Sequence, residues 1–233
     1  MDNSNNFIGI HETIRLHNHL NDKIIDNWVE SGLDLNIRDE EGNTPLMTAI
    51  SLAKLDIAII LANRGADLTA RNNRGETALL VAMTPDYKGS IHPHTALKLI
   101  EIDSDIVNEN LPENLGGYTP LILAIVNGND YVLDILIEKG AYLDAKANNG
   151  LTALMIASGH GKIEAVSKLQ SYRVQLDNQD DNGNTALHMA SAAGYHDIIE
   201  MLIDAGADQH ITNEDGLTYK DIENQSHIIS NLF

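Results

Sequence analysis

The sequence contains no cysteine, which excludes disulfide bonds, zinc sites built on thiolates and a cysteine nucleophile. Aromatic residues are also scarce at 4%, so the core must be mainly leucine, isoleucine and alanine. The first six residues are polar and lack the basic start and apolar run of a signal peptide. No stretch reaches the roughly 18 to 20 apolar residues of a membrane span. These absences predict a cytoplasmic protein, although secretion stays open.

Positive charge is scarce as well, since 15 lysines and arginines face 34 aspartates and glutamates, for a formal charge of -19. Such a surface repels phosphate backbones and anionic lipids, so we expect neither nucleic acid nor a membrane as a partner. It would attract a basic protein. Solubility alone is the alternative explanation of the charge.

One short motif returns along most of the chain. Its fullest form is Gly183-Asn184-Thr185-Ala186-Leu187-His188-Met189-Ala190. The interval between successive motif glycines is 33 residues in four of five cases and 42 in the remaining one. A fixed period of this size is typical of a solenoid, in which each unit buries its apolar face against its neighbours. The other motif glycines are Gly42, Gly75, Gly117, Gly150 and Gly216.

Each period has the features of a turn followed by two helices. The motif glycine allows the positive φ of a tight turn, and the threonine two residues later can cap a helix. After Gly42, the residues Leu46, Ala49 and Ile50 form an apolar stripe at helical spacing. A second helix would end at Gly65 in the left-handed conformation.

A 33-residue period with this motif resembles the ankyrin repeat. The resemblance covers residues 9–233 and implies an all-α ankyrin repeat solenoid, made of helix-turn-helix units with β-turn or hairpin tips. It implies a single domain, in which residues 1–39 form an N-terminal capping repeat and residues 214–233 form a truncated C-terminal cap. The five repeats between them are 40–72, 73–114, 115–147, 148–180 and 181–213.

No catalytic motif stands out from this pattern. Paired acids such as Asp180-Asp181 fall at turn tips, where solvated carboxylates are common. We therefore predict a protein that is not an enzyme and that holds no cofactor and no metal. The rival interpretation is a metal site or enzyme at the long third repeat, where His92, His94 and Asp86 lie close in sequence. A catalytic metal site requires three protein ligands, and the sequence does not place a third beside the two histidines.

The resemblance also implies where a partner would bind. Proteins of this kind bind other proteins with a concave face made of hairpin tips and first helices, and His188 would hydrogen-bond within the repeat stack. The middle repeats have apolar tip residues, which predicts an interaction patch centred on Tyr118 and Leu151. The alternative is that these side chains fold onto their own array. The predicted partner-binding residues are Tyr118, Leu151, Leu115, Val126, Asn148, Asn149, His160, Glu40, Glu41, Arg74, Glu76, Asp181 and Asn184.

The predicted function is a non-enzymatic module that binds another protein and is itself a monomer. The acidic residues Glu40, Glu41 and Asp181 are expected at the rims of the patch, where they would set partner choice. Such a module suits an inhibitor or immunity protein that blocks a basic enzyme or toxin. It also suits a scaffold or a secreted effector that binds cellular or host proteins. The isoleucine- and asparagine-rich composition hints at a bacterial source.

Overall fold

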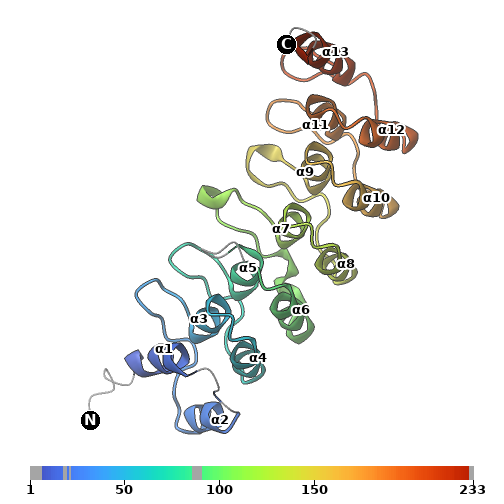
Figure 1. The fold of residues 1–233 in the computed structure, drawn as a ribbon. Coiled ribbons are helices and arrows are strands. Elements are labelled where there is room, and N and C mark those ends of the chain that lie inside the picture. The colour runs from blue at the N-terminus through green and yellow to red at the C-terminus, as the bar shows by residue number, and fades with distance from the viewer. Residues whose placement is uncertain (1–6, 18–19, 21, 86–90, 231–233) are drawn as a thin grey trace. The chain divides into compact units, whose positions relative to one another are not determined.

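The computed structural model describes residues 7–17, 20, 22–85 and 91–230, and this part of the chain is helical, with no β-strand (Figure 1). Two compact units, residues 1–112 and 113–233, are described one at a time below. A turn, a first helix, a short loop and a second helix recur in that order, which is the predicted all-α arrangement. None of the helices in the described residues is long and apolar enough to cross a membrane.

The first unit holds three helix pairs in its described residues, drawn from blue to green in Figure 1. The first helices α1, α3 and α5 form one row of contacts, and the second helices α2, α4 and α6 form another. Aliphatic side chains such as Leu46, Ile50 and Leu61 are fully buried in this unit. The helix bounds are α1 (Phe7–Leu16), α2 (Asp22–Glu30), α3 (Pro45–Ser51), α4 (Leu55–Asn63), α5 (Ala78–Met83), α6 (Pro93–Ile102) and the 3-10 helix η2 (Ser104–Asn108).

The second unit repeats the arrangement from green to red in Figure 1. The first helices α7, α9, α11 and α13 form one row of contacts, and α8, α10 and α12 form the other. Leu136, Ala157 and Leu169 are among its fully buried side chains. The helix bounds are η3 (Glu113–Leu115), α7 (Pro120–Val126), α8 (Asp130–Glu138), η4 (Asn148–Gly150), α9 (Ala153–Gly159), α10 (Ile163–Ser171), α11 (Ala186–Ala193), α12 (His196–Asp204) and α13 (Tyr219–Ser230).

The motif threonines begin the first helices. Thr44 before α3, Thr119 before α7 and Thr152 before α9 each accept a hydrogen bond from the backbone N–H three residues on. This bond satisfies an N–H that has no partner inside the helix. His188 adds a link in α11, because its Nδ1 accepts from the Thr185 N–H at 3.2 Å and its Nε2 donates to the Leu217 carbonyl at 3.0 Å. The expected hydrogen bonding of His188 within the stack is confirmed.

The turns that precede the first helices are closed by a side-chain oxygen at one repeated position. Asp39, Asn72, Asp180 and Asn213 each use Oδ1 to accept the backbone N–H four residues on, at distances between 2.7 and 3.0 Å. Ala147 occupies the same position before α9 and has no side-chain acceptor. The turn there forms the short helix η4 instead, in which Asn149 has a positive φ of 59°.

Candidate protein-binding groove

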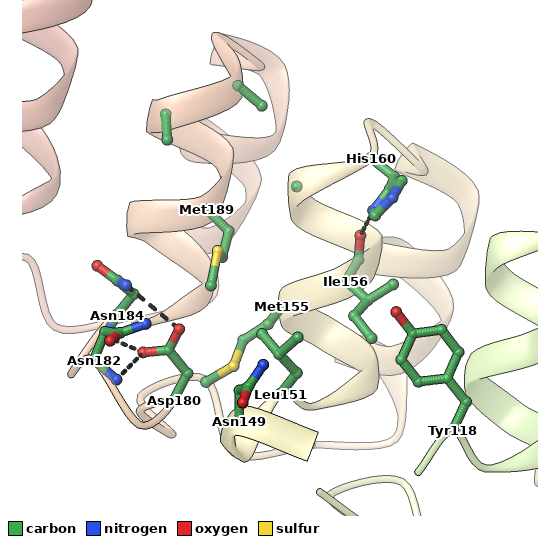
Figure 2. Close-up of a pocket in the computed structure, with 13 residues that line it drawn as sticks. Tyr118, Asn149, Leu151, Met155, Ile156, His160, Asp180, Asn182, Asn184 and Met189 are labelled. Atoms are coloured by element: carbon green, nitrogen blue, oxygen red, sulfur yellow. Dashed lines mark hydrogen bonds between the residues drawn. The ribbon is translucent and has the colours of Figure 1, made fainter. Parts of the chain in front are cut away.

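A groove with a volume of about 550 Å³ lies on the first helices α9 and α11 and the turns before them (Figure 2). It belongs entirely to the second unit. Figure 2 shows Tyr118 toward one end, Met189 and Asn184 toward the other, and Leu151 and Ile156 between them. The predicted partner-binding residues that line it are Tyr118, Asn149, Leu151, His160 and Asn184. The other residues that line it are Met155, Ile156, Gly159, Asp180, Asn182, Met189, Ala192 and Ala193.

Most of the groove is apolar, and small residues keep it open. Gly159 and Ala192 line it at the ends of α9 and α11. The equivalent residue of α7, 33 residues before Gly159, is Val126, whose larger side chain is 36% exposed. A Cβ added to Gly159 would lie 3.6 Å from the Met189 Cβ, which is ordinary van der Waals contact. The groove therefore has small residues where the preceding repeat has the larger Val126.

One carboxylate lines this groove. Asp180 is 8% exposed, which corrects the prediction of a solvated turn acid. Its Oδ1 accepts the backbone N–H groups of Asn182 at 3.0 Å and Asn184 at 2.7 Å, and its Oδ2 has a 3.4 Å contact with Asn184 Nδ2. Burial follows from this turn geometry, because the two short bonds hold the carboxylate against the turn. Asp180 forms no ion pair within the described residues.

The remaining polar groups are neutral amides and one imidazole. His160 Nδ1 donates to the Ile156 carbonyl at 2.9 Å, so Nε2 of the neutral ring is left as an acceptor (Figure 2). No lysine or arginine lines the groove. In this unit Lys168 instead pairs with Asp134 at 2.7 Å, and Lys146 donates to the Gln179 carbonyl at 3.0 Å. The groove is thus apolar with one negative charge.

The other predicted residues of the second unit lie outside the groove. Leu115 and Val126 are 38% and 36% exposed, and Asp181 is also exposed. The Asn148 side chain donates to the Glu113 carbonyl, so its amide is used within the chain. Tyr118 and Leu151, in contrast, line the groove and are half-buried. Their side chains are neither fully exposed nor folded away onto the array.

Four predicted residues belong to the first unit. Glu40, Glu41 and Arg74 are exposed there, as expected. The expected exposure of Glu76 is wrong, since only 1% of its surface is accessible. Its carboxylate accepts from Asn72 Nδ2 at 3.0 Å and from Arg74 Nε at 2.8 Å, and these bonds hold it inside the turn. Glu76 therefore presents no free carboxylate to a partner.

The rival metal site gains no support from the described residues. His94 is exposed and His92 is half-buried at the start of α6, while Asp86 lies outside the described residues. Among the residues that are described, no group of three or more histidines, aspartates or glutamates is arranged to hold a metal ion.

Sequence reasoning missed part of the groove. Met155, Met189 and Asp180 line it but were not among the predicted residues. A signal for Met189 exists in the register, because it stands 33 residues after Ile156 on the equivalent face of the next first helix. The register gives a signal for Asp180 as well, because Asn72 occupies the same repeated position and is also 8% exposed.

Three models of ankyrin repeats match this chain: a three-copy model at residues 141–213, a many-copy model at residues 29–82 and a single-repeat model at residues 116–148. An ankyrin repeat protein of Acanthamoeba polyphaga mimivirus is 32% identical over 181 residues, which is 77% of this chain and 23% of that protein. The human neurogenic locus notch homolog protein 1 is 32% identical over 130 residues, which is 55% of this chain and 5% of that protein. The chain thus spans less than a quarter of either relative.

Two solved structures share the fold. The ankyrin repeat domain of Bcl-3 has a TM-score of 0.74 at 20% identity, covering 95% of this chain and 96% of that chain. An ankyrin repeat domain from Acinetobacter baumannii AYE has a TM-score of 0.67 at 27% identity, covering 80% of this chain and 97% of that chain. The predicted all-α ankyrin repeat fold is confirmed.

Proposed function

This chain belongs to the ankyrin repeat family, whose domains mediate interactions between proteins, and on that premise we propose that it is a non-enzymatic module that binds a protein partner in the groove on α9 and α11. The observation that carries the proposal is the apolar groove itself. Its volume is about 550 Å³. It combines methionine, leucine, isoleucine and tyrosine side chains with a few polar groups, and methionine and aromatic residues are enriched at protein interfaces.

The charge of the chain favours a basic partner. Acids outnumber lysines and arginines by 17 to 6 in residues 113–233, and the groove is lined by no lysine or arginine. A basic protein would be steered to this surface and held without like-charge repulsion. An inhibitor or immunity protein that covers a basic enzyme or toxin agrees with these features. A scaffold or effector remains the alternative, and the identity of the partner decides between them.

The test is affinity capture with a pair of charge-matched variants. We expect the Tyr118→Arg, Leu151→Arg variant to lose the partner that the wild type captures, with an increase in Kd of at least about tenfold, because central aromatic and apolar contacts dominate such interfaces. The control is Tyr131→Arg, Tyr172→Arg, which adds the same charge at positions that are 65% and 55% exposed and do not line the groove.

The control separates the groove from general charge effects. Loss of the partner by both variants would attribute binding to net charge, and equal capture by both would move the site away from the groove. Circular dichroism of each variant verifies that the helices are retained. If the captured partner is an enzyme, inhibition of its activity by the wild type and not by the groove variant would establish the inhibitor role.

A further inference from the structure

The negative charge of Asp180 is not needed by the turn that it closes. Asn72 and Asn213 occupy the same repeated position, and each accepts the backbone N–H four residues on, at 2.9 and 3.0 Å. The turn therefore requires a side-chain oxygen at this position, and a neutral amide supplies it. The charge of Asp180 calls for a different explanation.

The other aspartate at this repeated position has partners for its charge. Asp39 pairs with Arg15 at 3.2 Å and lies 3.7 Å from the Nδ1 of buried His11. Asp180 has no such pair within the described residues, although it is 8% exposed and lines a groove with Met155 and Met189. A buried carboxylate without a counter-charge is costly, so a cation in the groove would be stabilised.

We propose that the groove receives the side chain of one arginine or lysine from the protein partner. This inference rests on the proposed function and adds the chemistry of the anchor. The aliphatic stem would lie along Met189 and Leu151, which line the groove and are half-buried. The cationic head would bind the Asp180 carboxylate, whose Oδ2 has only the 3.4 Å contact with Asn184. Long basic side chains combine an apolar stem with a positive charge, whereas an apolar anchor would lack the charge.

Peptide titration followed by NMR of methyl-labelled methionine tests this anchor directly. The chain has six methionines, of which Met155 and Met189 line the groove, while Met201 on α12 serves as an internal reference. The probes are short capped alanine-glycine peptides with a central arginine, lysine, norleucine or glutamate. We expect the arginine and lysine peptides to shift the Met155 and Met189 signals, with little change at Met201.

The variant Asp180→Asn should lower the affinity for the arginine peptide by about tenfold or more, because it removes the charge-assisted hydrogen bond. It should keep the fold, since asparagine already closes the equivalent turns at Asn72 and Asn213. The matched control is Asp208→Asn, which removes the same charge from an exposed turn residue outside the groove and should leave the affinity unchanged.

Three outcomes would overturn the inference. Equal shifts from norleucine and arginine would indicate an apolar anchor, and equal affinity of Asp180→Asn and wild type would remove Asp180 from the site. Absence of any shift with the arginine peptide at millimolar concentration would exclude the anchor altogether. If the groove variant still lost the captured partner in that case, the proposed function would stand without this anchor.

Discussion

Arg173 bears a conformational cost that its counterparts avoid. Its φ is 57°, while Gly140 and Gly206, 33 residues before and after it, have φ values of 85° and 98°. The left-handed conformation costs a non-glycine residue about 1 to 2 kcal/mol, and glycine in turn loses more chain entropy on folding, about 0.5 to 1 kcal/mol. We expect Arg173→Gly to leave the free energy of unfolding unchanged or to raise it by about 1 kcal/mol. Urea denaturation measures the difference.

A second substitution separates the backbone of Arg173 from its side chain. Arg173→Ala keeps the strained φ and removes the exposed guanidinium, so it should be no more stable than the wild type. A lower stability of both variants would mean that the Arg173 side chain makes stabilising contacts. Higher stability of the glycine variant alone would assign the effect to the backbone.

At the scale of the element, the start of α9 depends on one hydroxyl. Thr152 is 2% exposed, and its Oγ1 accepts the Met155 backbone N–H at 3.3 Å. Thr152→Val keeps the shape and removes this acceptor, so it should lower the free energy of unfolding by about 1 to 2 kcal/mol. Thr152→Ser keeps the acceptor and loses one methyl group, which should cost about 0.8 kcal/mol or less. A serine variant less stable than the valine variant would show that packing, not capping, dominates.

The elements could be predicted because their signals are local. Turn glycine, capping threonine and an apolar stripe lie within a few residues of one another and recur each period, as at Thr44, Thr119 and Thr152. Tyr118 and Leu151, which the repeat register predicts at the turn tips, line the groove, and their role in binding stays a prediction. The boundaries of the individual repeats stay a prediction.

The burial of acids was harder to predict from sequence. Glu76 and Asp180 stand at turn tips like exposed acids, and each is buried because its carboxylate accepts hydrogen bonds within its own turn. Glu76 is held by Asn72 and Arg74, whereas Asp180 is held by the backbone of its own turn. An acid at a turn tip therefore predicts the turn, while its burial depends on the hydrogen bonds that its carboxylate accepts within that turn.

At the scale of the whole molecule, a formal charge of -19 should make added salt act in opposite directions on folding and on binding. Self-repulsion destabilises the compact state, while attraction of a basic partner speeds its association. Both effects weaken as the Debye length falls from about 30 Å at 0.01 M salt to about 8 Å at 0.15 M. We expect the melting temperature to rise and the association rate to fall roughly tenfold over this range. Differential scanning calorimetry and stopped-flow fluorescence measure the two quantities. An association rate independent of salt would rule out electrostatic steering and, with it, the basic partner.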